Sequence, residues 1–247
     1  MILTPFRPSS LFSTLALLVA FVAAAPSAQG APRRPAAKPR AVVAKPLPAR
    51  VDTAPTVRVA LETGLGAIIV EVDRAHAPIT ADNFLRYVDQ KRFDGTVFYR
   101  AMRLGPDIHD QEQGLIQGGT QNDPKRILKA IAHEPTNLTG LRHVAGALSM
   151  ARWAPGTATG DFSILVSPLP ALDADPTQPG DNAGYAVFGH VVEGMDIVRR
   201  IHLSPTSPTL GEGHMKGQML APTIKIINAH RVTEPAAPLV KPSAPAQ

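Results

Sequence analysis

Short apolar runs of β-strand type recur along most of this chain and constrain its fold more than any other feature. "TVRVALETGLGAIIVEVD" at 56–73 alternates apolar and polar residues on both sides of a Gly-containing turn, which is the pattern of a β-hairpin. Further runs of this type, ending with "PTIKIINAHRV" at 222–232, are bounded by Gly, Pro or Asp. Helical spacing is confined to "ITADNFLRYVDQ" at 79–90, with Thr80 as the expected N-cap, and "MDIVRRIH" at 195–202. Many short strands with two distant helices predict a mainly β fold, a closed antiparallel barrel.

The two ends of the chain differ from this central part in composition. Residues 1–25 join a basic residue, Arg7, to an apolar segment that ends in small residues. This predicts a cleaved signal peptide, because the apolar segment is shorter than the about 20 residues of a membrane span; a retained anchor helix is the alternative. Residues 26–54 and 235–247 are rich in Ala and Pro and predict a disordered linker and tail. We therefore expect a folded domain at 55–234 in an exported protein, with no stable membrane insertion after signal cleavage.

The positive charge of the chain is concentrated in this N-terminal part. Residues 1–50 hold 7 of the 25 Lys and Arg and no Asp or Glu, which leaves 25 − 7 = 18 basic against 20 acidic side chains in the rest. We therefore expect no nucleic-acid-binding face on the domain. The basic linker is interpreted as a passive tether, with attraction to an anionic surface as the alternative. The chain has no Cys, which excludes disulfides, Cys nucleophiles and Cys metal sites.

The sequence lacks the motifs of several enzyme classes. Ser149 lies in "GALSMA" and not in a Gly-x-Ser-x-Gly elbow, and the Gly-x-Gly at 64–66 joins two strands instead of opening a helix. His133, Glu134 and His143 do not have the spacing of a zinc motif. No metal and no cofactor are expected.

The order of the remaining motifs resembles that of the cyclophilin-type peptidyl-prolyl cis–trans isomerases. The similarity covers about residues 57–232 and is carried by "ITADNFLRYV", "FDGTVFYRAM", "GLIQGG", "GALSMARWAPGTATGDFSI", "LDADP" and "GYAVFGHVVEGMDIVRRI". It implies a closed eight-stranded antiparallel barrel capped by two α-helices, with a proline pocket on the outer surface and no cofactor. It also implies that proline-containing polypeptides are the substrates. An exported isomerase without Cys fits a bacterial periplasm, and a barrel without free sheet edges is expected to be a monomer.

The resemblance assigns the chemistry to two polar residues. Rotation about an amide bond has a barrier of about 18–20 kcal/mol, and a site lowers it by binding the twisted amide better than the planar forms. Arg100 in "FYR" would be the catalytic residue, because a fixed cation can donate to the proline nitrogen of the twisted amide. Gln117 in "IQGG" would bind the substrate backbone and orient Arg100. A surface ion pair and a bond to the barrel backbone are the respective alternatives.

The same resemblance places five residues around the substrate. Leu115 and Leu172 would line the proline ring, although a core role is the alternative for both. Ala151 would contact the substrate backbone, and Tyr185 takes a position where the family has an aromatic residue or His. Ser163 stands where the second of two Phe residues would form the bottom of the pocket.

Three family positions have lost an aromatic side chain in this sequence: Gly114, Ser163 and Ala171. The segment 103–113 is also longer than in the family. Losing the Phe at the position of Ser163 removes apolar contact worth about 2 kcal/mol. Tight cyclosporin binding in the family often depends on an aromatic residue at the position of Ala171, so the resemblance implies weak cyclosporin binding. A proline-peptide-binding or chaperone module with little isomerase activity is therefore the alternative function, and tethering through the basic linker is a third hypothesis.

Overall fold

The computed structural model describes residues 54–104 and 113–232. The predicted signal peptide (1–25), nearly all of the predicted linker (26–54), most of the 103–113 insertion and the predicted tail (235–247) lie outside the described residues. The strands are β1 (Thr56–Thr63), β2 (Gly66–Asp73), β3 (Val97–Arg103), β4 (Gly114–Gly119), β5 (Ala147–Met150), β6 (Asp161–Leu165), β7 (Ala186–Glu193), β8 (Thr206–Ser207) and β9 (Met219–Arg231). The helices are α1 (Pro78–Asp89), α2 (Thr136–Thr139) and α3 (Met195–His202), with 3-10 turns η2 (Pro170–Leu172) and η3 (Gly213–Met215).

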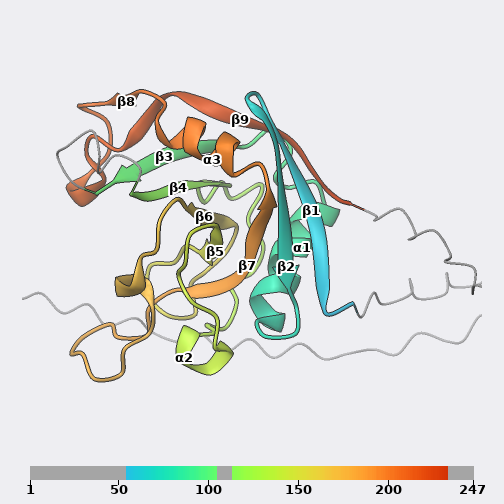
Figure 1. Cartoon of the computed structure of the whole chain (residues 1–247), viewed down its shortest axis with the longest axis vertical. Coiled ribbons are helices and arrows are strands. Elements are labelled where there is room, and N and C mark those ends of the chain that lie inside the picture. Colours follow the sequence, from blue (N-terminus) through green and yellow to red (C-terminus); the bar gives the residue numbers. More distant parts are fainter. Residues whose placement is uncertain (1–53, 105–112, 233–247) are drawn as a thin grey trace, which may run out of the picture. The chain divides into compact units, whose positions relative to one another are not determined.

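Antiparallel pairing closes the sheet into a barrel (Figure 1). The strands follow the order β1-β2-β7-β5-β6-β4-β3-β9, and β9 pairs with β1 to complete the circle. The two-residue strand β8 pairs with β9 outside this circle. The predicted closed eight-stranded antiparallel barrel is confirmed.

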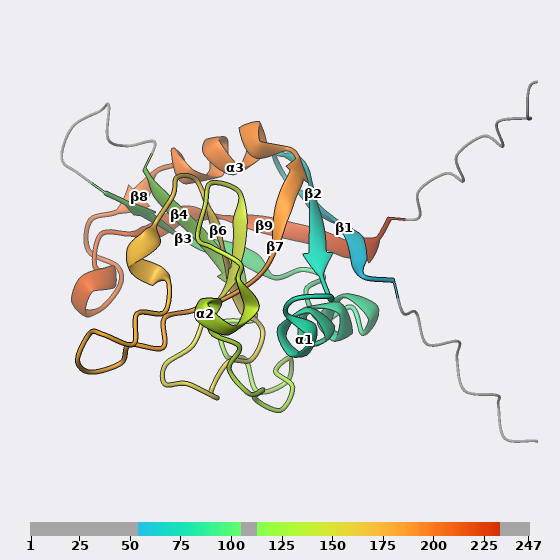
Figure 2. The same ribbon diagram turned by 60° about the horizontal axis from the view of Figure 1, so that its bottom comes forward.

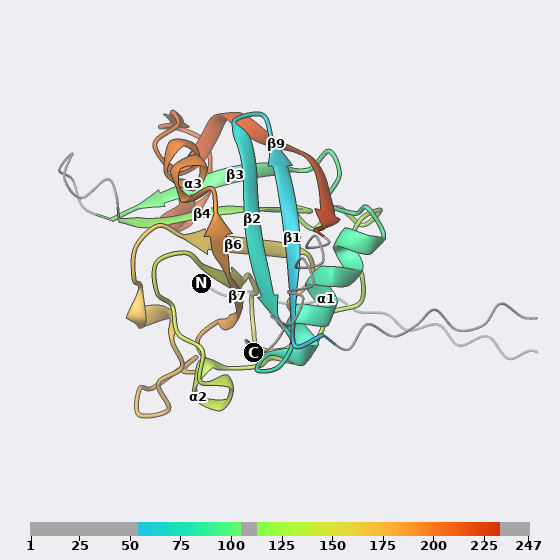
Figure 3. The ribbon, with the colours of Figure 1, turned by 45° about the vertical axis from the view of Figure 1, so that its right-hand side comes forward.

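Two helices cap the barrel at opposite ends, α1 at one and α3 at the other (Figures 2 and 3). Helix α1 begins at Pro78, so the predicted N-cap Thr80 lies inside its first turn. Pro is favourable at this position, and Glu134 supplies the missing acceptor by receiving the Thr80 N–H at 2.7 Å. In the part of the chain that the structure describes, none of the helices has the length and apolar character of a membrane span.

Aromatic rings fill the inside of the barrel. The fully buried Phe84 of α1 lies 5.1 Å from Phe93, 5.2 Å from Phe162 and 5.2 Å from Phe188, measured between ring centroids. These edge and tilted contacts add to the apolar burial of each ring. Phe162 of β6 therefore faces inward, which leaves its neighbour Ser163 on the outer face.

The strands β4, β5, β6 and β7 carry a second apolar cluster on that outer face. Their inward residues belong to the main core: Ile116, Leu148, Ile164 and Phe188. Outward residues of these strands, together with Leu169 from the segment after β6, form a separate cluster, here called the outer apolar cluster: Leu115, Ala147, Leu165, Leu169 and Val187. Since successive strand residues point to opposite faces, this cluster lies on the outer surface of the barrel wall.

Candidate active site

The strand register brings four polar residues into one row across the outer face. Arg100 of β3 pairs with Gln117 of β4, which pairs with Ser163 of β6, which pairs with Ser149 of β5. Residues paired across strands share a face of the sheet. We call these four residues the polar row. It places the expected catalytic pair next to Ser163 and beside the outer apolar cluster.

Two glutamines from distant segments orient Arg100. Its Nε donates to Gln218 Oε1 at 2.8 Å, and its Nη1 donates to Gln117 Oε1 at 2.9 Å. Of the five N–H donors of an arginine, two are thus bound to described residues and three remain available. The side chain is half-buried, and this burial lowers the pKa of Arg100 from its ordinary value. An arginine nevertheless stays charged in a protein, so the row ends in a fixed and partly desolvated cation.

The other end of the polar row joins a buried chain of hydrogen bonds. Asp173 Oδ1 accepts from Nδ1 of His143 at 2.7 Å, and Nε2 of His143 lies 2.9 Å from Ser149 Oγ. A proton on Nδ1 leaves Nε2 as the acceptor for the Ser149 hydroxyl. Burial lowers the pKa of His143, while the hydrogen bond that its ring donates to Asp173 opposes this shift. These hydrogen bonds link Ser149 of β5 to Asp173, which follows η2. Because Ser149 is itself buried, its hydroxyl is not accessible as a nucleophile.

The two predicted proline-lining leucines lie together. Leu115 belongs to the outer apolar cluster, and Leu172 packs against it. Leu115 is two residues from Gln117 on β4 and therefore shares its face. The structure thus places an apolar surface directly beside the polar row.

Gly114 cannot carry the side chain that the resemblance assigns to its position. Its φ is +136°, and an added Cβ would lie 1.9 Å from the backbone oxygen of Met102. The glycine is required by the close approach of β4 to β3. The aromatic residue is therefore excluded here by the backbone. Ser163, which is 8% exposed, does not have a positive φ, so its backbone conformation does not exclude a larger side chain.

The predicted contacts Ala151 and Tyr185 lie on two segments that meet at Arg152. Both residues are half-buried. The guanidinium carbon of Arg152 lies 5.0 Å from the ring centroid of Tyr185. Tyr185 N–H donates to Leu172 O at 2.9 Å, which connects this segment to the predicted proline-lining surface. Arg152 and Gln218 are site residues that the sequence analysis missed.

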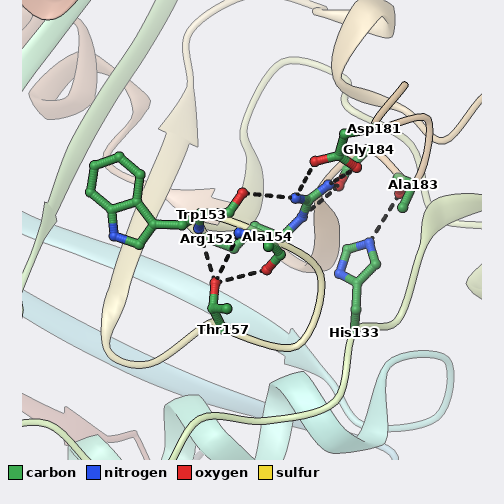
Figure 4. A network of polar contacts seen from close by, with 8 residues as sticks. All are labelled: His133, Arg152, Trp153, Ala154, Thr157, Asp181, Ala183 and Gly184. Atoms are coloured by element: carbon green, nitrogen blue, oxygen red, sulfur yellow. Dashed lines mark hydrogen bonds and ion pairs between the residues drawn. The ribbon is translucent and has the colours of Figure 1, made fainter. Parts of the chain in front are cut away.

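The residues considered for a metal site are used in structural contacts. His133 bonds through Nε2 to Ala183 O at 3.0 Å (Figure 4). Glu134 caps α1, and His143 belongs to the buried chain described above. Across residues 54–104 and 113–232, no three His, Asp or Glu side chains are grouped as metal ligands.

Comparison with known proteins matches the chain to one family. The family model described as "Cyclophilin type peptidyl-prolyl cis-trans isomerase/CLD" matches residues 58–231. A peptidyl-prolyl cis-trans isomerase of Acinetobacter baylyi is 39% identical over 153 residues, covering 60% of this chain and 73% of the relative. A peptidyl-prolyl cis-trans isomerase of Streptomyces antibioticus is 36% identical over 157 residues, covering 62% of this chain and 87% of the relative.

Solved structures share the fold at lower identity. A cyclophilin-type isomerase of Cryptosporidium parvum is 21% identical with a TM-score of 0.57, covering 73% of this chain and 99% of the other. A structure of that protein in the presence of the dipeptide Ala-Pro has a TM-score of 0.55 at 21% identity, covering 71% of this chain and 99% of the other.

Proposed function

The chain belongs to the cyclophilin-type peptidyl-prolyl cis–trans isomerases, and we propose that Arg100 is the catalytic residue of its isomerase activity. The observation that carries this proposal is the geometry of Arg100. It is a half-buried cation held by two glutamines. Hydrogen bonds to the described residues use two of its five N–H donors, which leaves three for a substrate.

Prolyl isomerisation requires a hydrogen-bond donor to the proline nitrogen, and Arg100 can supply one. In the planar amide the nitrogen lone pair is delocalised, and the barrier to rotation is about 18–20 kcal/mol. At the twisted transition state the lone pair returns to the proline nitrogen, which can then accept a hydrogen bond. An Arg100 N–H placed at that nitrogen binds the twisted amide better than either planar isomer, which is the requirement for catalysis. No nucleophile and no bond cleavage are needed.

Gln117 and Gln218 hold the guanidinium of Arg100 in one orientation. Each accepts one hydrogen bond from the guanidinium, at 2.9 Å and 2.8 Å respectively. Such fixed donors cost no reorganisation when the amide twists. The amide N–H₂ group of Gln117 is left to donate to a substrate carbonyl, since its Oε1 faces Arg100.

The outer apolar cluster is the proposed binding surface for the proline ring. Leu115 belongs to this cluster and lies two strand positions from Gln117, and Leu172 of η2 packs against it. Tyr185 is connected to this surface by its N–H bond to Leu172 O, and Ala151 and Tyr185 would contact the substrate backbone and side chains. A related isomerase was crystallised in the presence of Ala-Pro, which supports proline peptides as substrates.

We further propose that the enzyme acts on exported proteins in the periplasm, as a monomer. The composition of residues 1–25 supports export, and the closed barrel supports a monomer because it leaves no long sheet edge for pairing.

Exchange NMR on an Ala-Pro peptide tests this function. The wild-type protein is expected to speed cis–trans exchange, and Arg100→Ala should lower kcat/KM by about a hundredfold, as for loss of one transition-state donor. Arg231→Ala is the matched control, because Arg231 pairs with Asp89 on α1, away from the polar row. Equal rates for wild type and Arg100→Ala would refute the role of Arg100. Peptide binding without acceleration by the wild type would instead indicate a binding module.

A further inference from the structure

Arg152 uses its donors in a different way from Arg100. It lies two residues after Met150, where β5 ends, and its side chain is only 2% exposed. Nε donates to Gly184 O at 2.9 Å, and Nη1 donates to Trp153 O at 3.1 Å and to Asp181 Oδ2 at 2.6 Å. Nη2 donates to Asp181 Oδ1 at 2.9 Å and also to Gly184 O. All five N–H donors of this arginine are therefore bound within the chain.

Figure 4 shows the guanidinium reaching from the Arg152–Ala154 segment to Asp181 and Gly184. Among the described residues, Arg152 makes every hydrogen bond between these two segments. His133 also binds the Asp181–Gly184 segment, through Ala183 O. We call Arg152 together with Asp181 and Gly184 the arginine clamp.

The arginine clamp is adjacent to two residues of the proposed substrate site. Ala151 immediately precedes Arg152, and Tyr185 immediately follows Gly184. The Tyr185 ring lies 5.0 Å from the guanidinium carbon, within the range of a cation–π contact. The Tyr185 N–H also holds Leu172 O at 2.9 Å. A shift of the clamp would therefore move both Ala151, the proposed contact to the substrate backbone, and the aromatic ring of Tyr185.

The charge on the clamp persists into acidic solution. The hydrogen bond from Arg152 lowers the pKa of the exposed Asp181 carboxyl. The carboxylate is therefore ionised at neutral pH, where it pairs with Arg152. A bidentate arginine–carboxylate pair is geometrically specific, and a lysine cannot reproduce its planar fork.

We infer that Arg152 is a positioning residue of the isomerase site, which sets substrate affinity by holding Ala151 and Tyr185 in place. This inference rests on the proposed function. Arg152 has no donor left for the substrate, so its effect is indirect. Because the clamp holds binding surfaces and not the reacting amide, its loss should weaken ground-state and transition-state binding alike. Such a loss raises KM and leaves kcat nearly unchanged.

The test measures kcat and KM separately, by exchange NMR over a range of Ala-Pro peptide concentrations. Arg152→Ala is expected to raise KM by about tenfold with kcat within about twofold of wild type. Arg152→Lys should show most of this increase, since its ammonium cannot bridge Asp181 and Gly184 together. Asp181→Ala changes an exposed loop residue and should raise KM by about threefold without risk to folding. Arg231→Ala again serves as the control, because it removes a second bidentate arginine–aspartate pair far from the site.

The outcomes separate this inference from the proposed function. Unchanged KM in a folded Arg152→Ala protein, or in Asp181→Ala should the first variant misfold, would overturn the positioning role. A fall in kcat with constant KM would also overturn it. If those variants behave like wild type while Arg100→Ala is inactive, only the inference about Arg152 fails. If Arg100→Ala keeps full activity, the proposed site is wrong and the inference falls with it.

Discussion

Restoring an aromatic ring at Ser163 should strengthen substrate binding. Ser163 lies between Gln117 and Ser149 in the polar row, is 8% exposed, and borders the outer apolar cluster. Complete burial of a Phe side chain is worth about 1.5–3 kcal/mol. Part of the new ring would pack against the barrel in the free protein, so about half of this value should be gained on binding proline. A gain of about 1 kcal/mol corresponds to about a fivefold lower KM for Ser163→Phe.

The assay is exchange NMR with an Ala-Pro peptide, supported by urea unfolding to show that the variant is folded. Ser163→Ala is the matched control, since it removes the hydroxyl without adding a ring, and its KM should stay within about twofold of wild type. A folded Ser163→Phe protein with an unchanged or higher KM would refute the reasoning. The proline ring would then lie elsewhere on the outer face.

Three further predictions concern stability and inhibition. Gly114→Ala should destabilise the protein by about 2 kcal/mol or more, because its Cβ would meet Met102 O at 1.9 Å at a φ of +136°; an unchanged urea midpoint would contradict this. Burial lowers the pKa of His143, so the folded state binds fewer protons, and the free energy of unfolding should fall as pH drops from about 6.5 through that lowered pKa. His143→Asn should reduce this slope in urea titrations at several pH values, and an identical slope would count against it. Cyclosporin should not inhibit isomerisation at nanomolar concentration, because Ser163 and the exposed Ala171 offer it no aromatic surface; nanomolar inhibition would disprove this.

The fold was predictable because its strands carry local signals. Alternating apolar residues and Gly or Pro boundaries marked strands such as 56–63 and 66–73, and the motif order gave the closed barrel. The start of α1 was predicted wrongly at Thr80. The acceptor that caps the helix comes from Glu134, 54 residues away, and no local pattern reveals it.

The site was predictable in part for the same reason. Arg100 and Gln117 lie in recognisable motifs, and the structure brings them into contact. The bond from Arg100 to Gln218 joins residues 118 positions apart, and the clamp joins Arg152 to Asp181 over 29 positions. Such contacts depend on how loops return to the barrel, which composition and periodicity do not encode.

Because the site lies on the outer face of the barrel, alternate residues of a single strand serve either the stability or the activity of the protein. In β4, Ile116 packs inside the barrel, while its neighbours Leu115 and Gln117 face the proposed substrate. Changes at one set of alternate positions therefore alter how much folded protein a cell contains, and changes at the other set alter what each molecule does. A saturation mutagenesis screen that scores abundance and activity separately should show the two losses alternating with a period of two residues. A barrel of this kind can acquire new substrate preferences while its interior stays the same.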